Sequence, residues 1–182
     1  MNSIARPKPE EYAPYYETFV AKVPSGDIVE TLSRGIEDTD RLLGGLTGPQ
    51  AAFRYAPGKW SITEIAGHLC DTERVYTYRA LRFARGDATA LPGFDQDKFV
   101  AEAARDPRLL SDVLAEFRAV RAATVAFFRG VSPEALLRRG TANGFEFSVR
   151  AILYILAGHE IHHRRVIETR YLRIPEPPES PK

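Results

Sequence analysis

Apolar residues recur every three to four positions along four long stretches of this chain, a spacing typical of amphipathic helices. Short segments rich in Gly, Pro and Asp separate these stretches, and no stretch shows sustained two-residue alternation. The pattern therefore predicts an all-α chain. The first helix is expected over about residues 27–46, the second over 61–85, the third from Asp106-Pro107 to Gly130, and the fourth over 148–172.

Local signals support the helix starts. Ser61 and Glu64 form a capping box at the start of the second helix, in which each side chain can bond the other residue's free backbone amide. Asp106 followed by Pro107 combines a capping residue with a proline at the first helical position, so we expect the third helix to begin there.

Four helices joined mainly by short links predict an antiparallel four-helix bundle over residues 25–172. The connection between the second and third helices is longer, contains Pro92-Gly93-Phe94, and is expected to cover one end of the bundle. Residues 1–24 are rich in tyrosine and phenylalanine and are expected to form an N-terminal aromatic arm that packs on the bundle. Residues 173–182 are rich in proline and are expected to be a disordered tail.

Composition narrows the class of protein. The chain has 182 residues, is 44% hydrophobic and carries a formal net charge of +1, so we expect one domain that binds neither nucleic acid nor anionic lipid. The single cysteine, Cys70, cannot form an internal disulfide, and the N-terminus shows no apolar signal core. The longest apolar stretch, residues 151–158, is too short for a membrane span. We therefore expect a cytoplasmic protein.

All four histidines fall within two predicted helices. His159 and His163 lie four residues apart on the inward face of the fourth helix, and His68 lies beside inward-facing residues of the second. Three imidazoles that converge in an apolar bundle would each lose hydration, and one metal ion can compensate all three. The pattern therefore predicts a divalent metal ion (zinc, nickel or iron) on His68, His159 and His163, with a position left open for water or substrate.

The histidines allow other interpretations. They could instead be exposed side chains or hydrogen-bonded core residues, and His162 could compete with His163, although the four-residue ridge favours His163. The segment from His159 to His163 also matches H-E-x-x-H, the zinc-protease helix signature. We interpret that match as accidental, because only Glu168 follows as a ligand and no strand is predicted. Glu160 is expected on the surface or beside a metal-binding histidine.

The block Trp60-Ser61-Ile62-Thr63-Glu64 through His68-Leu69, with the later H-x-x-x-H of His159 and His163, resembles the DinB-like (DinB/YfiT-type) metalloenzyme superfamily. The resemblance implies a four-helix bundle, usually a homodimer, with a divalent metal ion on His68, His159 and His163. Characterised members of that superfamily include S-transferases that use a low-molecular-weight thiol. Arg165 departs from the Gly-Gln step that follows these histidines in many members.

The histidine pattern predicts a metal-dependent enzyme that acts on a small molecule, and the resemblance implies thiol S-transfer as its reaction. The alternatives are a metal-dependent hydrolase and a non-catalytic, metal-stabilised dimer, and no catalytic or cofactor-binding residue is assigned. Cys70 is expected to be a small buried side chain and Trp60 to pack at the bundle end. Asp71 and Glu64 are close enough in sequence to orient His68, but each is expected to be a solvated surface charge. The basic side of the second helix could attract an anionic thiol cofactor, but it is expected to face water together with Asp71 and Glu73; its residues are Arg74, Arg79, Arg82 and Arg85.

Overall fold

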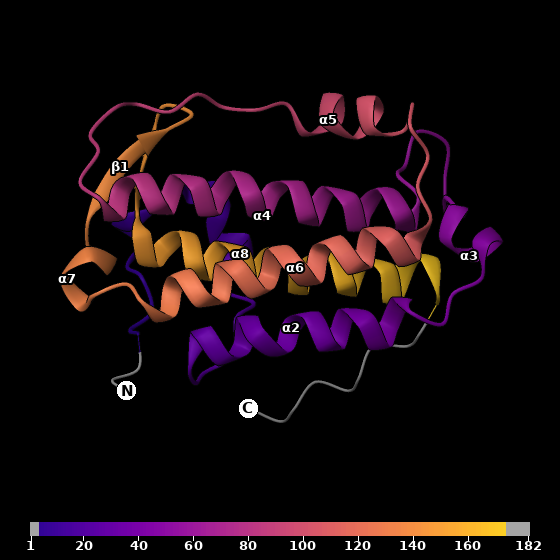
Figure 1. The fold of residues 1–182 in the computed structure, drawn as a ribbon, viewed down its shortest axis with the longest axis horizontal. Helices are drawn as coiled ribbons and strands as arrows, with labels where there is room; N and C mark the ends of the chain where they lie inside the picture. Colours follow the sequence, from indigo (N-terminus) through magenta and orange to yellow (C-terminus); the bar gives the residue numbers. More distant parts are fainter. Residues whose placement is uncertain (1–3, 174–182) are drawn as a thin grey trace.

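The computed structural model describes residues 4–173, in which four long helices pack side by side (Figure 1). They are α2 (Ile28–Leu43), α4 (Ile62–Ala84), α6 (Leu110–Arg129) and α8 (Val149–Val166), and α8 continues into a short π-helical segment, η3 (Ile167–Tyr171). The predicted four-helix bundle is confirmed.

The long crossing between α4 and α6 sets the direction of the helices. It returns along the outside of α4 through helix α5 (Gln96–Ala103), so α6 starts at the same end of the bundle as α4 (Figure 1). Two side-chain contacts between α4 and α6 show this direction, because residue numbers increase together along the two helices: Glu73 contacts Arg121, and Thr77 contacts Thr124. Hence α4 and α6 run in the same direction, whereas α4 packs antiparallel to α8.

The start of the third long helix differs from the prediction. α6 begins at Leu110 and has no side-chain cap, so the expected start at Asp106-Pro107 is wrong. Residues 104–109 instead carry the chain from α5, outside the bundle, back to the bundle end (Figure 1). The capping box of Ser61 and Glu64 is present at the start of α4 as predicted.

Short elements close the two ends of the bundle. Helix α3 (Gly48–Ala52) lies at one end, and helix α7 (Pro133–Leu136) lies at the other with a hairpin of β1 (Arg139–Ala142) and β2 (Phe145–Ser148) (Figure 1). The hairpin turns at Asn143 and Gly144, whose φ angles of 52° and 78° suit a two-residue turn. The sequence pattern missed this hairpin because its strands have four residues each.

The N-terminal arm packs along α8. It contains the short helical turns η1 (Pro9–Glu11), η2 (Pro14–Tyr16) and α1 (Glu17–Val20). A Cβ atom at Gly158 of α8 would lie 2.0 Å from the backbone oxygen of Phe19, so only glycine allows this close approach. The predicted aromatic arm is confirmed, whereas the predicted tail lies outside the described residues except for Arg173.

A second contact holds the start of the arm. Glu11 accepts hydrogen bonds from the Ser148 hydroxyl at 2.7 Å and from Nε of Arg150 at 2.7 Å. Burial alone would raise the pKa of Glu11, but the hydrogen bonds from Arg150, the Lys8 backbone and Ser148 outweigh it and lower that pKa to about 2. The arm is thus held by an ion pair at one end and by close packing at the other.

None of the helices in residues 4–173 has both the length and the apolar character needed to cross a membrane.

Candidate metal centre

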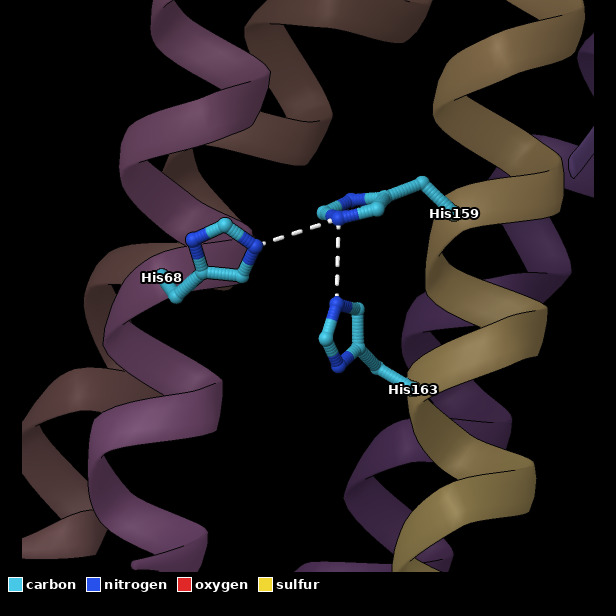
Figure 2. Close-up of side chains that lie close together, drawn as sticks. All are labelled: His68, His159 and His163. Carbon is cyan, nitrogen blue, oxygen red and sulfur yellow. Dashed lines mark hydrogen bonds between the residues drawn. The ribbon is translucent and has the colours of Figure 1, made fainter. Parts of the chain in front are cut away.

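Three of the four histidines meet between α4 and α8. Nε2 of His159 lies 3.1 Å from Nε2 of His68 and 3.1 Å from Nε2 of His163. His68 points across from α4, and the two other rings project from α8 one turn apart (Figure 2). Their ligand atoms all lie within 4.8 Å of one another. The structure thus brings together the three residues that the sequence singled out.

Neighbouring side chains fix the orientation of the rings. Nδ1 of His68 pairs with the Thr72 hydroxyl at 3.4 Å, which leaves its Nε2 facing the other two histidines. The rings of Trp60 and His68 pack at a centroid distance of 4.8 Å, and Phe19 of the arm packs edge-on against His159 at 5.2 Å. Packing on both sides therefore limits rotation of the imidazoles.

Neither Asp71 nor Glu64 orients His68, in agreement with the expectation that these carboxylates serve elsewhere. Glu64 accepts a hydrogen bond from the Ser61 backbone at 2.6 Å and pairs with Arg54, and an Asp71 oxygen lies 3.9 Å from the Arg74 guanidinium. The sequence could not identify Thr72, since a threonine one turn along a helix is common.

Burial keeps the three imidazoles neutral. His68 is 3% exposed and His159 is 8% exposed. Loss of hydration lowers the pKa of His68 to about 4 and that of His163 to about 3, with the nearby histidines adding to the shift at His163. Burial, followed by the neighbouring histidines, lowers the pKa of His159 well below its usual value. Neutral imidazole is the form that binds a metal ion.

The geometry of the three nitrogens fits a single divalent ion. A neutral imidazole nitrogen either donates one proton or presents one lone pair. Nε2 of His159 cannot satisfy two partners at 3.1 Å, so hydrogen bonds alone leave one contact unfavourable. Ligands about 2.0–2.1 Å from a tetrahedral zinc ion stand about 3.3 Å from one another, close to the spacing seen here.

His162 stands apart from this group. Its ring packs against Phe19 at 5.4 Å and against His163 at 5.1 Å, and it is absent from the cluster of ligand atoms found in residues 4–173. It lines a neighbouring cavity instead. The choice of His163 over His162 as a ligand stays a prediction, and the geometry supports it.

The cavity has a volume of about 280 Å³ and reaches the histidines from the side of the arm. His159, His162 and His163 form one part of its wall, and Thr72, Tyr76 and Arg79 of α4 form another. Its size lies near the lower end of small-molecule sites. A second cavity of about 380 Å³, between α4 and α5, is lined by only one of the four histidines, His68. The smaller cavity is therefore the better candidate for substrate access.

The sequence pattern did not predict a cluster of buried charges on the side of α8 that faces away from the histidines. Glu160 is 2% exposed and accepts hydrogen bonds from the Thr39 hydroxyl at 2.7 Å and from Nη1 of Arg121 at 2.8 Å. Arg121 is also 2% exposed, and its Nε and Nη2 donate to Glu73 at 2.9 and 2.7 Å. This cluster joins α2, α4, α6 and α8.

The expectation that Glu160 is a surface carboxylate or lies beside a metal-binding histidine is therefore wrong, because its oxygens bond Thr39 and Arg121. This agrees with an accidental H-E-x-x-H match. Glu73 and Arg79, expected to face water, are 2% and 4% exposed. One signal was present: Arg121 lies four residues from both Phe117 and Val125, on the apolar ridge of its helix.

Comparisons with known proteins agree with the four-helix fold. A family model described as the DinB superfamily matches residues 31–167. Among solved structures, YfiT from Bacillus subtilis superposes with a TM-score of 0.71 at 16% sequence identity, covering 81% of this chain and 85% of the YfiT chain. That protein is described as a probable metal-dependent hydrolase with an unusual four-helix bundle topology. No curated protein matches the chain significantly.

Proposed function

The chain belongs to the DinB superfamily, and from this premise we propose that it is a metal-dependent enzyme that acts on a small molecule. In this proposal His68, His159 and His163 hold one divalent ion. The observation that carries it is the convergence of three neutral Nε2 atoms, from the buried His68 and His159 and the half-buried His163, beside a cavity. A bound divalent ion supplies Lewis acidity, which lowers the pKa of a coordinated water or thiol.

The protein itself offers no thiol nucleophile at this site. Cys70 is 1% exposed, and burial raises its pKa to about 12. The reacting group must therefore come from solvent or from a second small molecule. Hydrolysis is supported by the similar fold of YfiT and its description. Thiol S-transfer, which the family resemblance suggests, is the second candidate and needs an external low-molecular-weight thiol.

Metal binding is tested by replacing each histidine separately. We expect His68→Ala, His159→Ala and His163→Ala to lower metal content sharply after dialysis against a mixture of zinc, nickel and iron, as measured by plasma mass spectrometry. His162→Ala is the matched control on the same helix, and it should retain nearly full occupancy. Wild-type occupancy in the variant that lacks all three predicted ligands would refute the site.

The reaction class is tested with the metal-loaded protein. Ester and amide hydrolysis is compared with thiol-dependent conjugation of an electrophile such as chlorodinitrobenzene, each with and without a low-molecular-weight thiol. Activity that requires the thiol and is lost in His159→Ala supports transfer, whereas thiol-independent activity lost in that variant supports hydrolysis. Metal binding without either activity supports the third alternative, a non-catalytic metal-stabilised dimer.

We also propose a homodimer. Tyr78 and Leu81 of α4 are 50% and 38% exposed, so part of an apolar surface of this helix is open to a partner. Light scattering at micromolar concentration tests this, and a mass that stays near 20.4 kDa on concentration would contradict it.

A further inference from the structure

A second buried arginine lacks the partners that Arg121 has. Arg79 of α4 is 4% exposed and lines the same cavity as His159 and His163. Its Nη2 donates to the backbone oxygen of Pro92 at 2.8 Å. Within residues 4–173, no carboxylate oxygen lies within 4.0 Å of its guanidinium. The guanidinium also contacts two aromatic residues: its carbon lies 5.0 Å from the Tyr76 ring centroid and 5.8 Å from that of Phe94, and the Tyr76 hydroxyl is a further hydrogen-bond partner.

A buried cation with these contacts is incompletely compensated. A guanidinium carries five N–H donors, and removal of a charge from water is costly unless an opposite charge or several hydrogen bonds replace the lost hydration. The other deeply buried guanidinium, Arg121, shows the usual solution, because it contacts two carboxylates. At Arg79 two aromatic rings, one carbonyl and the Tyr76 hydroxyl supply part of the compensation, but no carboxylate does. The remaining donors lie at the wall of a cavity, where a ligand can reach them.

The position of Arg79 relative to the histidines suits one bound molecule. His68, Thr72, Tyr76 and Arg79 follow one another along α4 at spacings of four, four and three residues, so they share one face of the helix. The Cα atoms of His68 and Arg79 are thus about 16 Å apart along the helix axis, and the long arginine side chain can span part of that distance. A molecule that fills the cavity can therefore contact Arg79 at one end and approach the histidines at the other.

The rest of the cavity wall indicates the other parts of this molecule. Tyr15, Phe19 and Phe94 contribute aromatic rings, and Gln96 and Asn143 contribute amides. Planar apolar groups pack well on aromatic rings, and amides bond either oxygen or nitrogen. A planar guanidinium matches the two oxygens of a carboxylate.

We propose that Arg79 binds the carboxylate of a small substrate whose apolar or aromatic body lies in the 280 Å³ cavity and whose reacting group faces His159 and His163. This inference rests on the proposed function, because it takes the cavity to be the substrate site of a metal-dependent enzyme. The competing role for Arg79 is purely structural: it holds the Pro92–Phe94 segment by its hydrogen bond and ring contact.

The experiment uses phenylacetate and phenylacetamide, which have nearly the same shape and differ in charge. Binding of each is measured by calorimetry to metal-free and to zinc-loaded protein. We expect the wild type to bind phenylacetate about tenfold or more tightly than the amide, as a charge-assisted pair requires. Arg79→Gln should lose this preference and Arg79→Lys should keep part of it. Arg85→Gln, which removes the same charge from an exposed position of the same helix end, should keep it in full.

Several results would overturn the inference. Equal binding of phenylacetate and phenylacetamide by the wild type overturns it without any variant, so the test does not depend on whether Arg79→Gln folds. A preference for phenylacetate that survives in folded Arg79→Gln also overturns the inference. If that surviving preference appears only with zinc, the carboxylate binds the metal, and the proposed function is unaffected. An Arg79-dependent preference in a protein that binds no metal refutes the proposed function, while Arg79 remains a carboxylate-binding residue of the cavity.

Discussion

Replacement of Arg121 by methionine tests the buried charge cluster most directly. The change removes a guanidinium that is 2% exposed and leaves Glu73 and Glu160, both also 2% exposed, without a cation. Methionine has a similar length and no hydrogen-bond donor. The variant therefore keeps most of the packing and loses the charge compensation.

The size of the effect follows from the geometry. Arg121 contacts Glu73 through two nitrogens and Glu160 through a third contact at 2.8 Å, and all three side chains are shielded from water. Loss of one partner from a buried ion pair costs about 3–5 kcal/mol, chiefly because the other charge remains buried. For a chain of this length, each 1 kcal/mol corresponds to roughly 2–4 °C in Tm. We expect the Tm to fall by roughly 6–20 °C.

Urea denaturation of the metal-free protein, followed by circular dichroism, measures the loss. Arg118→Met is the control: Arg118 lies on the same helix and pairs with Asp40 at 2.6 Å, but its side chain is 51% exposed, so about 1 kcal/mol or less is expected. A triple variant that also replaces Glu73 and Glu160 with leucine should be more stable than Arg121→Met alone. A loss below about 1 kcal/mol in Arg121→Met, or simple additivity in the triple variant, would refute the reasoning.

Three further outcomes are expected. The folded-state pKa of Glu11, about 2, lies below its usual 4.5, so its stabilisation, on the order of 3 kcal/mol, is full above pH 4.5 and is lost as the pH falls toward 2. The free energy of unfolding of Glu11→Gln, measured by urea denaturation, should therefore fall less between pH 4.5 and 2 than that of the wild type. Gly158→Ala should displace the arm, seen as faster proteolysis near Phe19, whereas Gly67→Ala, with open space around its Cβ position, should not. The Cys70 thiol should react with Ellman's reagent only after denaturation, and rapid reaction of the native protein would contradict its burial.

Much of the fold could be predicted from helix periodicity and capping residues. Ser61 and Glu64 marked the start of α4 because both halves of a capping box are local in sequence. Asp106-Pro107 looked equally favourable, yet α6 begins at Leu110, because the chain must first cross from α5 to the bundle end. That requirement comes from the tertiary structure, so no pattern in the neighbouring residues indicates it. The hairpin was missed for a different reason, since strands of four residues are too short to show alternation.

Some residues of the candidate site could likewise be predicted from the sequence, and others could not. His68, His159 and His163 could be selected because they continue apolar ridges on two long helices, which is a property of spacing. Thr72 and Arg79 could not, since threonine and arginine are ordinary on exposed helix faces and only the arm and the crossing bury them here. Residues whose environment comes from distant segments stay hidden from a reading of one helix at a time.

The separation of His68 from His159 along the chain, 91 residues, has a consequence for biosynthesis. Translation supplies His68 early, but the two imidazoles of α8 appear only after α6, α7 and the hairpin have been made. A nascent chain that ends at α6 therefore holds one of the three nitrogens, and one ring alone cannot retain an ion selectively. The three nitrogens come together only when α8 docks between the arm and α4, so in the proposed metal site ion binding would be coupled to that late docking step.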